Sequence, residues 1–166
     1  MKNPSRNAMM LLSLLLMNAV WAQTSATNGA AKTNLHQQYN LLGENVGLAG
    51  YDPVAYFPEG GGKAARGLIG NSYQHEGITY RFSSPENLTR FKQNPAKYLP
   101  AYGGWCAWAV AELGKRVDVD PESYVIKDGK LYVFYRDPAL DTRALWQKDA
   151  AGFVQKGDAK WPALSR

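Results

Sequence analysis

The chain has 166 residues, of which 45% are hydrophobic and 20% are charged, and its formal net charge is +5 at pH 7. These values are typical of a single globular domain and exclude a disordered polar chain. The weak positive charge indicates an ordinary solvated surface, so we expect no nucleic-acid partner.

The first 22 residues have the order of a secretory signal peptide. Lys2 and Arg6 give a cationic start, residues 8–16 are mainly apolar, and small residues precede a cleavage point after Ala22. We therefore predict a periplasmic or secreted protein. The apolar stretch is too short for a comfortable membrane span, and no cysteine follows the cleavage point, so we expect no stable membrane anchor after cleavage.

Residues 23–45 are mostly polar, and we interpret them as a flexible leader. The first folded element is expected after the turn at Asp52-Pro53. There Val54 and Tyr56 alternate with their neighbours, a pattern that predicts a short strand.

Two later segments predict β-hairpins. In residues 71–84, alternating apolar side chains flank a turn at Glu76-Gly77. In residues 122–137, two alternating runs flank the Asp-Gly dipeptide at 128–129, which favours a type I′ turn.

Three helices are predicted from their start and stop residues. The first follows a cap at Ser83 or Ser84 and ends at Asn94-Pro95. The second covers residues 105–113 and ends at Gly114, and the third begins at Thr142 and is weakened at Gly152. Hairpins with short helices packed on them predict an α+β fold. The predicted core consists of Tyr56, Tyr80, Phe82, Leu88, Phe91, Trp108, Val110, Ile126, Leu131 and Val133.

The only cysteine, Cys106, lies in the segment YGGWCAWAV. Gly103 and Gly104 allow a sharp turn that directs amide groups at one point, and the first turn of the following helix would stabilise a thiolate. Tyr102 and Trp105 would then surround the sulfur. A free cysteine also packs well as a small apolar residue, and the spacing alone favours burial without chemistry.

Other residues with catalytic or metal-binding chemistry are sparse. The sequence has no C-x-x-C or H-x-x-x-H pair and no G-x-S-x-G motif. His36 lies in the predicted leader, and His75 lies beside a predicted turn. The carboxylates Asp118, Asp120 and Glu122 precede a hairpin, and turn chemistry explains Asp120-Pro121 without catalysis.

Four stretches in collinear order resemble the exported YHS-domain proteins: "GYDPVAYF", "YRFSSPENLTRFKQNPAKYLPAYGGWCAWAV", "DGKLYVFY" and a late "WP". The similarity runs from about Gly50 to Trp161. It implies that residues 46–166 form a small YHS-like domain with an α+β fold of antiparallel hairpins and short helices.

The wider YHS family includes modules attached to copper-transporting ATPases and to multicomponent hydroxylases, in which cysteines are the suspected metal ligands. The family pattern places these cysteines at Ala55, Ser83 and Asn87 of this sequence, where none is present. Alanine cannot bind a metal, and serine and asparagine are poor ligands for soft metals, so the resemblance carries the fold rather than this metal site.

The exported branch of the family carries the motif Y-G-G-x-C-A, and some similar proteins have selenocysteine at the cysteine position. The resemblance therefore implies redox or metal chemistry at Cys106, which we predict to be the catalytic or metal-ligating residue. The predicted binding residues around it are Tyr102, Gly103, Gly104, Trp105, Tyr51 and Asp52.

Three functions are open at this point. We predict a small binding or accessory module, not an enzyme, in which Cys106 holds copper, another soft metal or a redox-active ligand. The first alternative is a thiol-based redox enzyme that depends on an external resolving thiol. The second is a structural interaction domain with a buried Cys106. The sequence does not identify the protein or small molecule that would be the partner.

Overall fold

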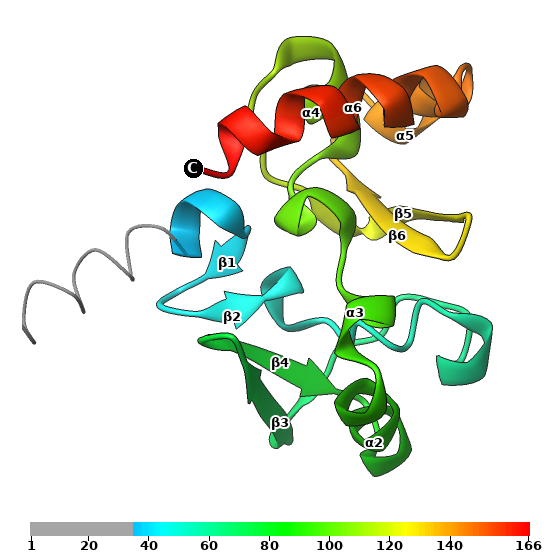
Figure 1. Cartoon of the computed structure of the whole chain (residues 1–166). Helices are drawn as coiled ribbons and strands as arrows, with labels where there is room; N and C mark the ends of the chain where they lie inside the picture. The colour runs from blue at the N-terminus through cyan, green and yellow to red at the C-terminus, as the bar shows by residue number, and fades with distance from the viewer. Residues whose placement is uncertain (1–34) are drawn as a thin grey trace, which may run out of the picture. The chain divides into compact units, whose positions relative to one another are not determined.

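A computed structural model describes residues 35–166 (Figure 1). The predicted signal peptide and its cleavage site lie outside these residues. The described part combines a four-stranded sheet, a two-stranded sheet and short helices, which confirms the predicted α+β class. Within residues 35–166, none of the helices has both the length and the apolar character needed to cross a membrane.

The folded domain includes residues that we predicted to be leader. Residues 35–38 form a helical turn, and β1 (Leu41–Leu42) pairs with β2 (Val46–Gly47). The leader prediction is therefore wrong for residues 35–45. These residues are held because three of them pack against the main hydrophobic core: Leu35, Tyr39 and Leu41.

The first predicted hairpin is confirmed. Strands β3 (Leu68–His75) and β4 (Ile78–Phe82) pair antiparallel around Glu76 and Gly77, whose φ angles of 50° and 82° are left-handed. The sheet order is β1-β2-β4-β3, and β2 runs parallel to β4. This parallel contact could not be predicted from the sequence, because β2 has only two residues.

The strand predicted at residues 54–57 is wrong. Residues 53–56 form a turn between the 3₁₀ helices η1 (Leu48–Gly50) and η2 (Pro58–Gly60). The carboxylate of Asp52 accepts hydrogen bonds from the backbone N–H groups of Val54 (2.8 Å) and Ala55 (3.2 Å), which bends the chain. The side chains of residues 54–57 are all buried, so the alternation of these residues does not separate a core face from a solvent face.

Helix α2 (Pro85–Gln93) begins and ends as predicted. The Ser84 hydroxyl accepts a hydrogen bond from the N–H of Asn87 at 3.2 Å, and Pro85 occupies the first turn. α3 (Pro95–Tyr98) follows directly. The fully buried Phe91 fixes α2 on the sheet, since its ring lies 5.1 Å from the rings of Tyr80 and Phe82.

Helix α4 (Ala107–Leu113) begins two residues later than predicted and ends as predicted, at the left-handed Gly114. It follows the 3₁₀ segment η3 (Ala101–Gly104). Cys106 has non-helical dihedral angles, and its N–H donates to the carbonyl of Val117 at 3.0 Å. Cys106 is therefore the N-cap residue and does not belong to the first helical turn.

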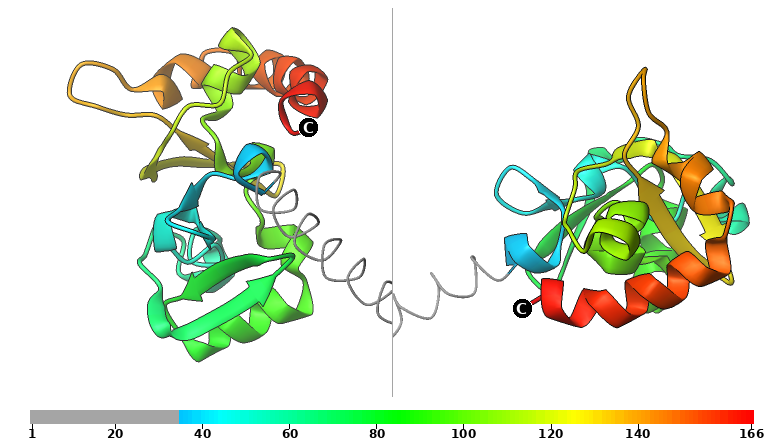
Figure 2. Two further views of the ribbon diagram at one scale, coloured as in Figure 1. Left: turned by 90° about the vertical axis from the view of Figure 1, so that its left-hand side faces the viewer. Right: turned by 90° about the horizontal axis from the view of Figure 1, so that it is seen from above.

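The second predicted hairpin is also confirmed, and it lies between two hydrophobic clusters. β5 (Asp120–Lys127) and β6 (Lys130–Phe134) flank a turn in which Asp128 and Gly129 have φ angles of 51° and 73°. Figures 1 and 2 show the hairpin between the four-stranded sheet and the C-terminal helices. Alternate β6 side chains point to opposite faces and enter different clusters. Leu131 and Val133 join the first cluster, which is the main hydrophobic core. Tyr132 and Phe134 join the second cluster, which packs around Trp146.

The C-terminal helix predicted from Thr142 is two helices, α5 (Thr142–Gln147) and α6 (Ala150–Leu164). The break lies at Lys148-Asp149 rather than at Gly152. Asp149 caps α6 by accepting the N–H of Gly152 at 3.0 Å, so Gly152 belongs to the first turn of a new helix. Of the predicted core residues, Leu88, Trp108 and Ile126 are only partly buried, and the other seven are buried.

A surface ion pair between η2 and α3 predicts a small pH dependence. Lys97 Nζ lies 2.6 Å from Glu59 Oε1, and this hydrogen bond is the main reason that the pKa of Glu59 lies below its ordinary value of 4.5. A lowered carboxyl pKa contributes stability above the unfolded value and loses it as the pH falls through the folded one. We therefore expect the Glu59→Gln variant to lose less stability than the parent protein between about pH 6 and about pH 3, measured by urea unfolding. Equal losses would contradict this assignment.

Candidate functional site

The structure buries Cys106 completely, with an exposed fraction of 0%. Its Sγ lies 3.4 Å from Oγ1 of Thr142, which is itself 2% exposed. Thr142 donates its hydroxyl proton to the carbonyl of Tyr135 at 2.7 Å. Because a hydroxyl has only one proton, the S–H group of Cys106 is left as the donor to Thr142. The sulfur is thus a satisfied core group.

Tyr102, predicted to border the thiol, belongs to the second hydrophobic cluster. Its ring centroid lies about 6 Å from those of Tyr132 and Trp161 (5.9 Å and 6.0 Å), and its hydroxyl donates to Asp158 Oδ1 at 3.1 Å. Burial, followed by the nearby Asp158 charge, raises the pKa of Tyr102 well above its ordinary value. Tyr102 is therefore a neutral packing residue that anchors α6.

The two glycines, predicted to be binding residues, hold an N-terminal segment through their backbone carbonyls. Gly103 has a left-handed φ of 60°, and its carbonyl accepts the N–H of Asn40 at 2.9 Å. A Cβ atom at this position would overlap the carbonyl oxygen of Gln38. Asn40 Nδ2 also donates to the carbonyl of Gly104 at 3.3 Å. Gly103 and Gly104 therefore allow the backbone of residues 38–40 to lie close to η3.

Trp105 is partly buried and packs on the second cluster. Its indole N–H, like that of Trp146, is buried without a hydrogen-bond partner among residues 35–166. Trp105 and Cys106 therefore contribute mainly packing to this part of the domain.

Asp52, also predicted to be a binding residue, is the centre of a buried hydrogen-bond network. Its exposed fraction is 0%, and Oδ1 accepts the two backbone N–H groups that shape the turn after it. Oδ2 accepts from the N–H and hydroxyl of Ser83 at 2.8 Å and 2.7 Å, and from Asn87 Nδ2 at 2.7 Å. Five donors thus compensate the desolvation of one carboxylate.

The three positions at which the YHS pattern has cysteines meet at this network. Ala55 donates its N–H to Asp52, and the side chains of Ser83 and Asn87 both contact Asp52 and lie 3.3 Å from each other. Asn87 Nδ2 also reaches the carbonyl of Gly60 at 3.2 Å. Segments that lie more than 25 residues apart in the sequence therefore converge on one carboxylate.

Neither the surroundings of Cys106 nor the network around Asp52 has the ligands that a soft metal requires. Residues 35–166 contain no group of three or more His, Cys, Asp or Glu side chains that could hold a metal ion. The neighbour of the thiol is a threonine hydroxyl, and the side chains of Ser83 and Asn87 donate to Asp52. Soft metals prefer thiolate, thioether or imidazole ligands, so these donor sets do not suit copper.

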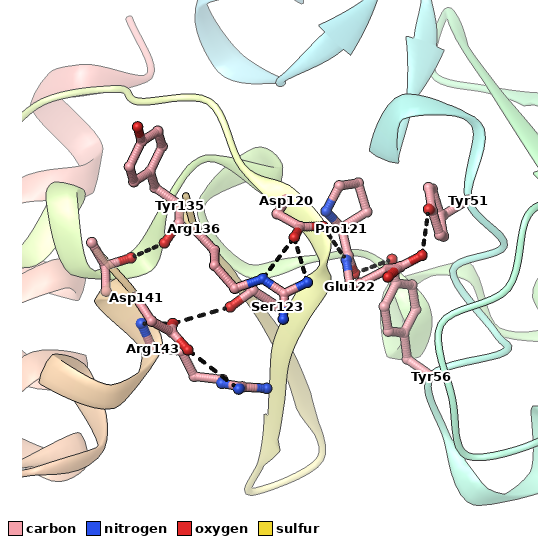
Figure 3. Close-up of polar contacts among 11 residues, drawn as sticks. Tyr51, Tyr56, Asp120, Pro121, Glu122, Ser123, Tyr135, Arg136, Asp141 and Arg143 are labelled. Carbon is pink, nitrogen blue, oxygen red and sulfur yellow. Dashed lines mark hydrogen bonds and ion pairs between the residues drawn. The ribbon is translucent and has the colours of Figure 1, made fainter. Parts of the chain in front are cut away.

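A belt of charged and aromatic residues lies along the first half of β5 and contains the carboxylates of Asp120, Glu122 and Asp141. Turn chemistry explains Asp120-Pro121 from the sequence, and the sequence alone assigns no role to Asp141. Figure 3 shows that each of these acids has a partner. The partners are the Tyr51 hydroxyl for Glu122 at 3.0 Å, the Arg136 guanidinium for Asp120 at 2.7 Å, and Arg143 and Ser123 for Asp141 at 3.3 Å and 3.4 Å.

Electrostatics in this belt favours fixed pairs over acid–base catalysis. Burial, followed by the hydrogen bond to Glu122, raises the pKa of Tyr51. The hydrogen bond to Asp120 raises the pKa of Arg136 further above an already high value. Tyr51 is thus tied to β5, and the described contacts of Cys106 connect it neither to Tyr51 nor to Asp52. The predicted site residues do not form one site.

A cleft lies beside the second half of β5, and its wall includes Arg143 of the belt and Tyr56 of the turn that follows Asp52. Its volume is about 510 Å³, and it is lined by Tyr56, Pro58, Gly62, Tyr124, Val125, Ile126 and Arg143. Most of the lining is aromatic or aliphatic, with a single charged side chain. The alternating pattern of β5 indicated a strand, but the cleft depends on segments that are distant in the sequence.

Comparison with protein-family models, with curated proteins and with solved structures gives no match to this chain.

Proposed function

We propose that this chain is a non-catalytic interaction domain on a YHS-like scaffold, with Cys106 as a structural core residue. The observation that carries this proposal is the complete burial of Cys106 against Thr142. Thiol catalysis and metal binding both require a sulfur that a second molecule can reach. This favours the interaction domain over the thiol-dependent binding module that the sequence led us to predict.

The arrangement around Asp52 supports the YHS-like scaffold. Ala55 lies far in the sequence from Ser83 and Asn87, yet all three residues contact Asp52. Residues that held a common metal in a related domain would have to converge in the same way. In this chain we propose that hydrogen bonds to a buried carboxylate take the place of metal–thiolate bonds and tie the same segments together.

The predicted signal peptide makes an exported domain part of the proposal. In an oxidising compartment an exposed lone thiol is prone to oxidation or to disulfide formation with other molecules. A sulfur enclosed in a hydrophobic cluster avoids both reactions. Complete burial is therefore compatible with a single cysteine in a periplasmic or secreted protein.

Alkylation of Cys106 by iodoacetamide tests the proposal directly. We expect the folded chain to react at least about 100-fold more slowly than the same chain in guanidinium chloride, because reaction requires the protein to open. The ratio is measured by mass spectrometry over a range of pH. The Cys106→Ser variant is the control for modification at other residues. Rapid, pH-dependent alkylation of the folded chain would overturn the structural role.

Titration with Cu(I) separates the interaction domain from a metal-binding module. We expect the parent chain and the Cys106→Ala variant to give the same titration curve, because the sulfur contacts the hydroxyl of Thr142 and residues 35–166 contain no group of three or more His, Cys, Asp or Glu side chains that could hold a metal ion. Stoichiometric binding that is lost in Cys106→Ala would restore the metal-binding interpretation. Circular dichroism of both proteins shows whether the variant is folded.

A further inference from the structure

The outer edge of β5 has no strand partner among residues 35–166. β5 pairs with β6 alone, and none of the isolated bridges in this range involves β5. The outer edge of β6, by contrast, is bridged at Leu131 by Pro100. Pro121 lies within β5, and proline is tolerated at sheet edges because it lacks a backbone donor.

The hairpin register identifies the backbone groups that point outward. A two-residue turn makes Lys127 and Lys130 a hydrogen-bonded pair, and such pairs alternate along an antiparallel ladder. The N–H and C=O groups of Val125 therefore face β6, whereas those of Tyr124 and Ile126 face away. None of the backbone hydrogen bonds outside the regular ladders of residues 35–166 uses the groups of Tyr124 or Ile126.

The cleft beside this edge provides side-chain recognition. Tyr124 and Ile126 form part of its wall, together with Tyr56 and Pro58 from the turn region. The side chain of Arg143 is 33% exposed, and among residues 35–166 its guanidinium makes one hydrogen bond, to Asp141 at 3.3 Å. A guanidinium has five N–H donors and pairs well with carboxylates, so Arg143 retains the capacity to bind one more.

We propose that the outer edge of β5 binds an extended segment of a partner protein as an added antiparallel or parallel strand. Aliphatic side chains of the segment fill the cleft, and an Asp or Glu carboxylate of the segment binds Arg143. The inference rests on the proposed interaction-domain function and names its site and the chemistry of its partner. The partly exposed Arg143 guanidinium keeps donors beyond its hydrogen bond to Asp141, which favours a partner that carries a carboxylate; self-association is an outcome of the test.

Amide hydrogen exchange of the full chain, followed by NMR, is the first test. In dilute free protein we expect the N–H of Val125 to be protected and those of Tyr124 and Ile126 to exchange rapidly. Val125 is the internal control, since it lies between the other two. Protection of all three amides in dilute protein would mean that the chain covers its own edge, and protection only at high concentration would mean self-association. Either result overturns the proposal.

A random peptide display library supplies the second test. We expect the full chain to enrich peptides with aliphatic residues at alternate positions and an acidic residue, and the enriched peptides to protect the amides of Tyr124 and Ile126. Arg143→Gln should weaken binding about tenfold, whereas the matched control Arg136→Gln should not. No enrichment, or protection elsewhere, overturns the β5 site. If the enriched peptides protect another surface, the β5 site is wrong but the proposed interaction-domain function is still supported. Rapid alkylation of Cys106, by contrast, contradicts the structural role of Cys106 and does not test the β5 site.

Discussion

Replacing Asp52 with alanine is expected to destabilise the domain by about 3–5 kcal/mol, from the loss of hydrogen bonds to a buried charge together with the cavity left behind. The carboxylate accepts five hydrogen bonds, two from the turn that follows it and three from Ser83 and Asn87. Its removal leaves these buried donors without their acceptor and opens a cavity between the turn and α2. Domains of this size are stable by roughly 5–15 kcal/mol, so the loss is a large fraction of the total.

Urea unfolding of matched variants separates the hydrogen bonds of Asp52 from its packing. Asp52→Asn keeps the shape of the side chain but places an NH₂ group against donors, so we expect it to be nearly as damaging as Asp52→Ala. Asp118→Ala is the surface control, since Asp118 is exposed and should change stability by no more than about 0.5 kcal/mol. If Asp52→Asn were close to neutral, Asp52 would be a space-filling residue and the network would contribute little.

Gly103→Ala is expected to produce the second large loss, about 3 kcal/mol or more. A left-handed φ by itself costs an alanine about 1 kcal/mol. At Gly103 the added Cβ also overlaps the backbone oxygen of Gln38, which cannot move without displacing the segment that packs on the core. We therefore expect residues 38–40 to detach, with faster exchange of the Asn40 amide.

Gly43→Ala is the matched control for this prediction. Gly43 has a φ of 61°, against 60° at Gly103, and a Cβ atom there would meet nothing within 4 Å. The difference between the unfolding free energies of Gly103→Ala and Gly43→Ala therefore measures the cost of the steric overlap with Gln38, because the cost of a left-handed alanine is common to both variants. Equal losses would show that the approach of residues 38–40 to Gly103 does not contribute to stability, and that another role must be sought for the glycine pair.

Much of the local structure could be predicted because its causes are local. Asp128-Gly129 and Glu76-Gly77 adopt left-handed conformations that two-residue hairpins require. Ser84 caps α2 through a residue three positions away, and Gly114 ends α4 by its own backbone conformation. In each case the physical reason lies within a few residues, so a single sequence contains it.

The errors arise where partners are distant in the sequence. The turn after Asp52 replaced a predicted strand because its carboxylate is fixed by residues 83 and 87 as well as by its neighbours. Residues 35–45 are held by backbone hydrogen bonds to distant residues: the Gly103 carbonyl accepts the N–H of Asn40, and the N–H of Thr79 donates to the carbonyl of Asn45. No periodicity within either segment reports such contacts, which depend on how the two sheets and the helices pack.

The amino-acid sequence by itself determined the α+β class, both hairpins, the start and end of α2, and the presence of one thiol beside a glycine pair. Only the tertiary structure decided whether that thiol reaches solvent. Burial depends on Thr142, which packs on the sulfur from a helix 36 residues further along the chain. Tertiary packing also assembled the free edge of β5, the turn after Asp52 and Arg143 into one cleft, because its walls come from three separate segments.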